Sequence, residues 1–288
     1  MPLDTKMIMK LREATGMGIT NCKKALEEAN GNFEAAELAL RKQGLDKAAK
    51  KADRPTGQGV VAVKTDANRA AIIELACEQE PTTNNARFAE ATEKLLLLAL
   101  SLPGAWEGAE TLLDAAAQTG AGRDLVNGLA AVVGENVQLR KAAVIEAPDN
   151  GMLGFYVHFN RKAGAVAALT LGNGVRPDAA LQTAANDVCM HSVAARPIAF
   201  RRSDIPESVL ATEREVFMEE VKNKPEAMRE KIIEGKMVKF FGEKVLPEQP
   251  FVKDPAGKTT VKQMLDAAAA AAGGTAEITA FIRFELGR

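Results

Sequence analysis

The sequence is poor in the side chains on which most active sites depend. It holds two histidines, three cysteines, one tryptophan and one tyrosine among 288 residues, with a net charge of −1. Covalent or acid–base catalysis needs a cluster of nucleophile, base and orienting group, and so few histidines and thiols disfavour one. Aromatic residues at 5% and the absence of a net positive charge also disfavour direct nucleic-acid binding.

The three cysteines, Cys22, Cys77 and Cys189, are far apart, odd in number and without CxxC spacing. This pattern predicts free thiols in a reducing cytoplasm, and no metal-ligand spacing is present. The N-terminal segment carries Asp4 and lacks the apolar stretch of a signal peptide. Runs such as LLLLALSL are too short to cross a bilayer. We therefore expect a cytoplasmic protein with no membrane contact, metal or cofactor.

Residues 1–54 carry the pattern of three short helices, which we call the head. Asn30-Gly31 predicts the end of the second helix and Gly44 the end of the third. Leu26, Leu38 and Leu40 are expected to line the inner face of this small bundle. A Lys/Ala-rich helix and a Pro-Thr-Gly-Gln-Gly linker follow the third helix.

Beyond the linker, strand–turn–strand–helix occurs twice, which predicts an α+β protein with a two-part α/β core. The first hairpin turns at residues 66–68, and the second copy follows about 95 residues later. Between the copies we expect a helix, a break at Gly134 and a strand. The two copies are GVVAVKTDANRAAIIELAC with NARFAEATEKLLLLALSL, and GFYVHFNRKAGAVAALTLG with PDAALQTAANDVCMHSVAA.

Residues from about 204 to 244 are charged and amphipathic, with a turn at Asn223-Lys224-Pro225, and predict a helical hairpin. A last helix and strand follow it. The predicted domains are therefore residues 1–54, residues 55–147 and residues 148–288, the third including the hairpin. The hairpin could pair two chains or pack on the core, so the oligomeric state stays open.

The two histidines do not form a catalytic pair locally. His158 lies in a predicted strand, and His191 lies two residues after Cys189 on a predicted helix, where the two side chains face different sides. A pair of Cys77 with either histidine through space is the remaining alternative. Packing or partner contact explains both histidines better.

The segment DPAGKTTVKQML, residues 254–265, resembles the second half of a phosphate-binding loop. The first glycine of that motif is missing, because Val252 stands five positions before Gly257. A glycine turn followed by a threonine helix cap also explains these residues. A phosphate-binding enzyme is thus a rival hypothesis that this segment supports weakly.

Residues 72–85, IIELACEQEPTTNN, begin as an apolar strand and end without any large apolar side chain. Proline cannot donate to a sheet ladder, so the strand is expected to stop before Pro81, with Pro81 exposed. We call residues 79–82 the tip. It either closes a turn between strand and helix or reaches for a partner.

Residues 11–52 resemble the N-terminal module of the bacterial elongation factor Ts family. The family pattern L-R-x-x-T-G-x-G-x-x-x-C-K-K-A-L runs here from Leu11 to Leu26. The segments GENVQLRKAAVIE, MHSVAARP, EGKMVKFFGEKVLPEQPFVKD and EITAFIRFELG also resemble the family, in order along the chain. The resemblance therefore covers nearly the whole sequence.

The resemblance implies a ubiquitin-associated-like three-helix module, a two-part core and a helical hairpin. It also implies a guanine-nucleotide exchange factor for elongation factor Tu, active in translation elongation. Such a factor is not an enzyme with a nucleophile: it binds the GTPase, distorts its magnesium and phosphate site, and so lowers its affinity for GDP. The partner is a protein, with no direct contact to nucleic acid.

The resemblance further implies which residues meet that partner. Relatives carry Thr-Asp-Phe-Val at the tip, where the phenylalanine wedges between helices of the GTPase, and here Pro81 replaces it. The alternative is a degenerate relative that binds elongation factor Tu but exchanges nucleotide slowly, since the tip lacks the Asp-Phe pair. The expected partner-binding residues are Lys23, Gln79, Glu80, Pro81, Thr82, Val133, Gly134 and His158.

Overall fold

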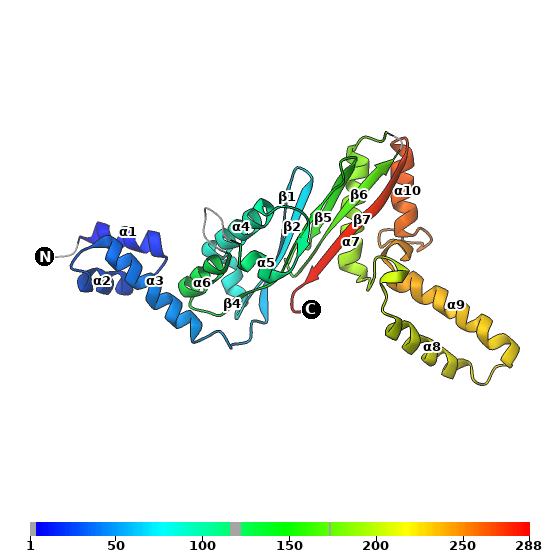
Figure 1. The fold of residues 1–288 in the computed structure, drawn as a ribbon, viewed down its shortest axis with the longest axis horizontal. Coiled ribbons are helices and arrows are strands. Elements are labelled where there is room, and N and C mark those ends of the chain that lie inside the picture. The colour runs from blue at the N-terminus through cyan, green and yellow to red at the C-terminus, as the bar shows by residue number, and fades with distance from the viewer. Residues whose placement is uncertain (1–3, 116–121, 173) are drawn as a thin grey trace. The chain divides into compact units, whose positions relative to one another are not determined.

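The computed structural model describes residues 4–115, 122–172 and 174–288 and has the mixed helix and sheet architecture predicted from the sequence (Figure 1). The chain forms two compact units. The first contains Met1–Val144, Phe159–Ala163 and Phe284–Arg288, and the second contains Ile145–His158 and Gly164–Arg283. The three predicted domains, residues 1–54, 55–147 and 148–288, stay a prediction, because the compactness of a unit does not show which parts of the chain fold independently.

The head folds as three helices, α1 (Thr5–Thr15), α2 (Ile19–Glu28) and α3 (Phe33–Ala49). The Asn32 side chain caps α3 by accepting from the Ala35 N–H at 2.9 Å. Short polar side chains at this position satisfy N–H groups that have no partner within the helix. The small core of the head consists of Ile8, Leu11, Cys22, Ala25, Leu26, Ala36 and Leu40.

Two expectations for the head are wrong. Leu38 is 68% exposed, whereas Leu26 and Leu40 are buried. Side chains two positions apart on a helix point about 200° apart around its axis, so Leu38 cannot lie on the same buried face as Leu40. Gly44 does not end α3, which continues to Ala49. A Cβ at Gly44 would lie 2.7 Å from the Ala131 Cβ, so this glycine permits close packing of α3 on helix α6 (Gly122–Val133).

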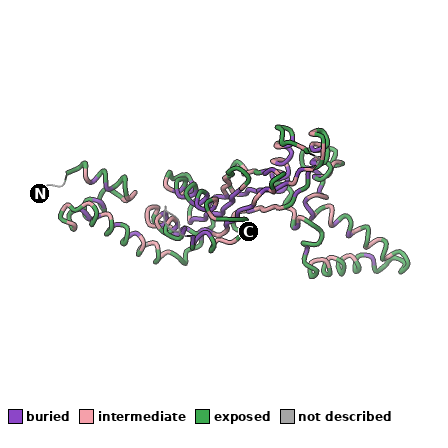
Figure 2. The backbone as a smooth tube through the Cα atoms, turned by 45° about the horizontal axis from the view of Figure 1, so that its top comes forward, coloured by how far each residue is buried: buried purple, intermediate pink, exposed green. Residues whose placement is uncertain are grey.

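The sheet of the first unit has the order β1-β2-β4-β3. Strands β1 (Gln58–Asp66) and β2 (Arg69–Cys77) form the predicted hairpin, with Asp66 opposite Arg69 and Ala67 in the left-handed region at φ 44°. Strands β4 (Val137–Glu146) and β3 (Trp106–Glu107) complete it. Helices α4 (Ala86–Ser101), α5 (Ala109–Leu113) and α6 share its core with β2, which is buried along almost its whole length (Figure 2).

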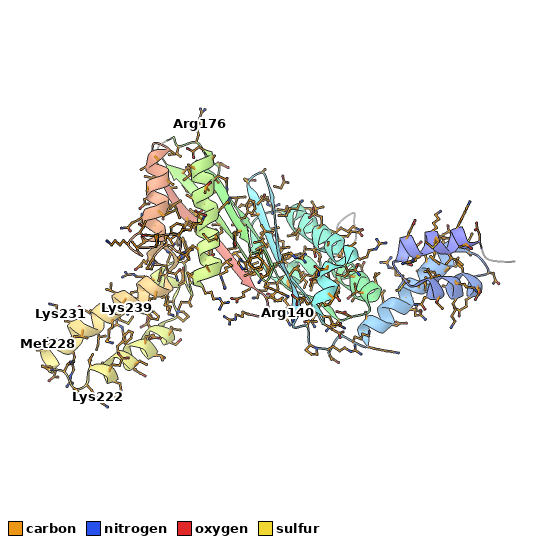
Figure 3. All side chains as sticks on the ribbon, turned by 180° about the vertical axis from the view of Figure 1, so that it is seen from behind. Arg140, Arg176, Lys222, Met228, Lys231 and Lys239 are labelled. Carbon is orange, nitrogen blue, oxygen red and sulfur yellow. The ribbon has the colours of Figure 1, made fainter. Side chains whose placement is uncertain are left out.

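The second unit has a sheet of order β5-β6-β7, formed by β5 (Gly151–Val157), β6 (Ala163–Gly172) and β7 (Thr275–Glu285). Helices α7 (Ala179–Ala195) and α10 (Val261–Ala271) contribute to the same core. The predicted helical hairpin is confirmed and consists of α8 (Glu207–Val221) and α9 (Glu226–Lys244). Its inner side buries Met237 and Phe240, while Met228, Lys231 and Lys239 extend from α9 into solvent (Figure 3).

The segment that resembles a phosphate-binding loop holds an anion of its own. The Asp254 carboxylate accepts from the backbone N–H groups of Ala256 and Lys258 at 2.9 Å each and of Thr259 at 2.7 Å. These bonds lower the pKa of Asp254. Thr260 then caps α10 in a reciprocal box with Gln263. Since a carboxylate occupies the backbone donors that a phosphate would need, the turn-and-cap explanation of this segment is favoured.

His191 is a buried packing residue on α7, which is one of the two explanations that the sequence left open. Its Nδ1 accepts from the Val252 N–H at 3.1 Å, so the neutral ring carries its proton on Nε2, which lies 3.0 Å from Gln249 Oε1. Burial lowers the pKa of His191, and the bond to Gln249 partly opposes that shift. Protonating Nδ1 would break the bond from Val252, so the fold favours the neutral imidazole.

We expect the free energy of unfolding to fall on acidification through His191. Below the ordinary pKa of 6.5 the unfolded chain binds a proton that the folded chain does not, so stability from the neutral ring is complete above that pH and declines below it. The decline is at most about 1.4 kcal/mol per pH unit. The free energy of unfolding is measured with urea at pH 7, 6 and 5 for the wild-type chain and for His191→Gln. The difference in this free energy between the two proteins should become smaller as the pH decreases. A constant difference would contradict this assignment.

Candidate functional site

The tip is a short turn at the end of a buried strand. β2 ends at Cys77, and residues Glu80–Asn84 form a 3₁₀ turn, η1, with Pro81 in its first turn. Proline is tolerated there because the first N–H groups of a helical turn have no internal partner. Pro81 is exposed, as predicted, while Thr83 is buried and donates to the Glu80 carbonyl at 2.8 Å. The tip thus presents Glu80 and Pro81 outward from an anchored base.

A second turn, residues 133–136, lies beside the tip. Helix α6 ends at Val133, and Gly134 follows at φ +71° with its N–H donated to the Ala130 carbonyl at 2.9 Å. Glycine adopts this left-handed conformation without the penalty of a Cβ. The predicted break at Gly134 is therefore confirmed, and the glycine is exposed.

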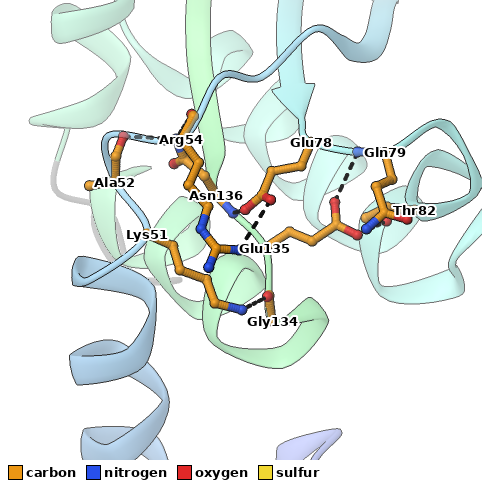
Figure 4. A network of polar contacts seen from close by, with 9 residues as sticks. All are labelled: Lys51, Ala52, Arg54, Glu78, Gln79, Thr82, Gly134, Glu135 and Asn136. Carbon is orange, nitrogen blue, oxygen red and sulfur yellow. Dashed lines mark hydrogen bonds and ion pairs between the residues drawn. The ribbon is translucent and has the colours of Figure 1, made fainter.

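Glu135 joins the tip to this turn. Its Oε2 accepts from the Gln79 N–H at 3.1 Å, and its Oε1 accepts from the Thr82 hydroxyl at 2.6 Å (Figure 4). The structure therefore brings together two stretches that the sequence predicted separately, residues 79–82 and residues 133–134. The residue that connects them was not predicted, although it directly follows Gly134 in the segment GENV.

Glu78, the residue before the tip, is fixed by the same turn. Its Oε1 accepts from the Asn136 N–H at 2.6 Å, and its Oε2 lies 3.4 Å from the Arg54 guanidinium (Figure 4). The bond from Asn136 is the main cause of the lowered pKa of Glu78, and Arg54 adds to it. Glu78 is therefore a carboxylate at neutral pH and holds the end of β2 against the start of β4.

The last residues of the head, 51–54, reach the same turn from the other side. The Asn136 amide nitrogen donates to the Ala52 carbonyl at 2.8 Å and to the Arg54 carbonyl at 2.6 Å. The Lys51 ammonium donates to the Gly134 carbonyl (Figure 4). Asn136 is 5% exposed, and its bonds satisfy a buried amide that would otherwise be costly. Residues 134–136 thus contact both the end of the head and the tip.

Two cations of the first unit, Arg161 and Lys162, contact η1: Lys162 binds within the tip and Arg161 binds the last residue of η1. Lys162 Nζ lies 3.5 Å from the Glu80 carboxylate and donates to Gln58 Oε1 at 2.8 Å. Arg161 donates to Asn84 Oδ1 at 3.1 Å. No local sequence pattern indicates these contacts, since Asn84 and Arg161, for example, lie 77 positions apart.

The tip offers no nucleophile. Cys77 is buried and donates its Sγ–H to the Gln79 carbonyl at 3.2 Å. Burial, followed by the nearby Glu135 carboxylate, raises the pKa of Cys77 to about 11. A thiol with such a pKa stays protonated and unreactive at neutral pH. What this surface can do is present shape and hydrogen-bonding groups to a partner.

The remaining predicted residues lie elsewhere. Lys23 is exposed on α2 and pairs with Glu27 of the same helix at 3.8 Å. His158 follows β5 in the second unit, where its Nδ1 lies 3.1 Å from the Tyr156 hydroxyl. The roles of both as partner contacts stay predictions.

Neither a metal site nor a membrane span is found in the parts of the chain that the structure describes. Across residues 4–115, 122–172 and 174–288, no group of three or more His, Cys, Asp or Glu side chains is placed to hold a metal ion. Over the same ranges, each helix is too short or too polar to cross a membrane.

Comparison with known proteins gives consistent matches. A family model described as Elongation factor TS matches residues 82–288. The elongation factor Ts of Thioalkalivibrio sulfidiphilus is 38% identical over 291 residues, covering 100% of this chain and 93% of the relative. That of Maricaulis maris is 38% identical, covering 98% and 91%, and that of Chlamydia felis is 35% identical, covering 96% of both chains.

Proposed function

The chain belongs to the elongation factor Ts family, and from this premise we propose that it is the guanine-nucleotide exchange factor of an elongation factor Tu. In this proposal it binds the GDP-loaded GTPase, distorts the magnesium and phosphate site, and promotes GDP release during translation elongation. The observation that carries the proposal is the exposed, braced tip beside the turn at Gly134, a contact surface without a nucleophile. Distortion of a partner needs such a surface and no covalent chemistry.

The proposed partner contacts are Lys23 of the head, the tip residues Gln79, Glu80, Pro81 and Thr82, the turn residues Val133 and Gly134, and His158 of the second unit. Glu80 and Pro81 are exposed beside the less exposed Thr82. In the proposal they enter the GTPase next to its magnesium site, while Lys23 and His158 dock other parts of the partner. Binding at several points would hold the tip in place during distortion.

Thermodynamic linkage states what such a factor must do. If binding of the chain weakens GDP binding by a given ratio, GDP must weaken binding of the chain by the same ratio. The chain therefore has to bind the nucleotide-free GTPase more tightly than the GDP-loaded form. A chain with equal affinity for both forms could not shift the equilibrium, however tightly it bound.

The test is release of fluorescently labelled GDP from purified elongation factor Tu, with the chain at a small fraction of the GTPase concentration. We expect turnover, with a maximal release rate at least about tenfold above the spontaneous rate, which corresponds to lowering the barrier to release by about 1.4 kcal/mol. Titration of the chain with GTP, without the GTPase, is the control for the rival phosphate-binding enzyme. That titration should give no binding.

The same assay separates the proposal from the degenerate relative, which binds but exchanges slowly. A tight complex with nucleotide-free elongation factor Tu but no faster release would establish the slow relative and exclude the exchange factor. If the chain neither forms a complex with elongation factor Tu nor speeds GDP release, both the exchange factor and the slow relative are excluded.

A further inference from the structure

We propose that Glu135 is a positioning residue for nucleotide release. Its carboxylate fixes the tip against residues 133–136, so that Pro81 and Gly134 meet the GTPase as one rigid element. This inference rests on the proposed exchange function and adds to it a residue that the family resemblance did not single out. It is carried by the geometry of the carboxylate and by the way its own turn is held.

Both carboxylate oxygens are engaged, each with one end of the tip. Oε2 takes the Gln79 N–H at 3.1 Å and Oε1 takes the Thr82 hydroxyl at 2.6 Å. Hydrogen bonds to an ionised acceptor are about twice as strong as neutral ones. Because the two donors lie three positions apart, the tip cannot pivot about either one without stretching the bond to the other.

The turn that carries Glu135 is itself fixed on both sides. The Gly134 carbonyl accepts from Lys51, and the buried Asn136 donates to Glu78, Ala52 and Arg54. Glu135 thus extends from a backbone whose neighbours on either side are bonded to other segments (Figure 4). A force on the tip would pass through Glu135 into this anchored turn.

The tip is also held by Lys162 at Glu80, and Arg161 holds Asn84 at the end of η1. Pro81 therefore projects from a loop that is supported from two directions. This support matters for exchange, because a loop that yields on contact loses binding free energy to its own ordering. A stiff loop directs that free energy into displacing groups of the partner.

The experiment uses the full chain with Glu135→Gln and Thr82→Val, singly and combined. Glutamine keeps the size of Glu135 but lacks its charge and one acceptor oxygen, and valine keeps the shape of Thr82 without its hydroxyl. We expect each single variant to lower the maximal rate of GDP release about tenfold, the usual effect of losing a hydrogen bond to a charged group. The half-saturating concentration of the chain should stay within about twofold, because contacts made equally in both GTPase states are kept.

The double variant decides whether the two residues act together. Residues that share one interaction give non-additive effects, so Glu135→Gln with Thr82→Val should be as slow as either single variant. A product of the single effects, about a hundredfold loss, would mean that Glu135 acts by itself on the partner and would overturn the inference. The matched control is Glu93→Gln, which removes an exposed carboxylate paired with Lys64 at 2.6 Å. This variant should promote GDP release at the wild-type rate.

Hydrogen–deuterium exchange of the isolated chain tests, in the absence of the GTPase, whether the two hydrogen bonds of Glu135 hold the tip. In Glu135→Gln, amide exchange of Gln79, Glu80 and residues 82–84 should become about tenfold faster while the global melting temperature stays close to that of the wild type. Unchanged release rates in both single variants, with an active wild-type chain, would overturn the inference and leave the proposed function standing. An inactive wild-type chain would overturn the proposed function and, with it, this role.

Discussion

Replacing Pro81 with phenylalanine is expected to raise the maximal rate of GDP release about tenfold. Complete burial of a phenylalanine side chain contributes roughly 1.5–3 kcal/mol, and Pro81 already supplies part of that surface. If the added contact forms only in the state with weakened nucleotide, a gain of about 1.4 kcal/mol corresponds to a factor of ten. The measurement is the release rate of labelled GDP at a saturating concentration of the variant.

Stability should change little in this variant. Pro81 is exposed, and surface substitutions away from special contacts usually stay within about 0.5 kcal/mol. Phenylalanine also restores a backbone N–H that can bind water at this exposed turn. A melting temperature close to that of the wild-type chain would assign the rate change to the partner contact.

Pro81→Gly is the matched control, because it removes both the side-chain surface and the restriction on φ at the same position. It should slow GDP release while the phenylalanine variant speeds it. Equal rates for the wild-type chain and both variants would mean that the tip takes no part in exchange. The exchange activity would then depend on other contacts, such as those proposed for Lys23 and His158.

The Pro81 and Glu135 predictions address different properties of the same loop. Pro81→Phe changes how much apolar surface enters the partner, whereas Glu135→Gln changes how firmly the loop is held. If both are correct, the phenylalanine gains less in a Glu135→Gln background, because a yielding tip cannot use the added surface fully. In the proposed mechanism, rigidity of the braced tip compensates for the smaller side chain of Pro81.

The secondary structure was predictable because its signals are local. Helix caps such as Asn32, the glycine break at Gly134 and the change from helical to strand periodicity after the linker all lie within a few residues of the feature that they determine. The exposure of Pro81 was predictable for the same reason. The two-part core and the hairpin followed from the order of these elements.

The wrong helix end at Gly44 and the missed Glu135 contact both result from tertiary packing, whereas the exposure of Leu38 follows from helix periodicity alone. Glycine is common just after the end of a helix, but Gly44 lies inside α3, where a Cβ would collide with Ala131 of α6. Glu135 reaches Gln79 and Thr82 across more than fifty positions, and no local pattern indicates such a pairing. The candidate site could therefore be outlined from the sequence, as two stretches, but the residue that joins them could not.

Gly154→Ala is expected to lower the free energy of unfolding by about 3 kcal/mol, at the upper end of the cost of overpacking a core. Gly154 lies on β5, directly beneath α7, and a Cβ there would lie 2.3 Å from the Ala185 carbonyl oxygen and 2.6 Å from its carbon. These atoms belong to the backbone of α7 and cannot rotate away as a side chain could. The helix would have to move off the sheet and give up contacts of Leu181, Val188 and their neighbours.

The matched control is Gly235→Ala on α9, where the glycine is exposed and, apart from the backbone of its own helix, no described atom lies within 4 Å of a Cβ built at that position. Alanine inside a helix is more favourable than glycine by roughly 0.5–1 kcal/mol, so the same substitution should stabilise the chain there. Thermal unfolding should show a melting temperature about 6–12 °C lower for Gly154→Ala and unchanged or higher for Gly235→Ala. Equal melting temperatures would show that α7 can shift on β5 at little cost, and the tight approach at Gly154 would then not be needed for the fold of the second unit.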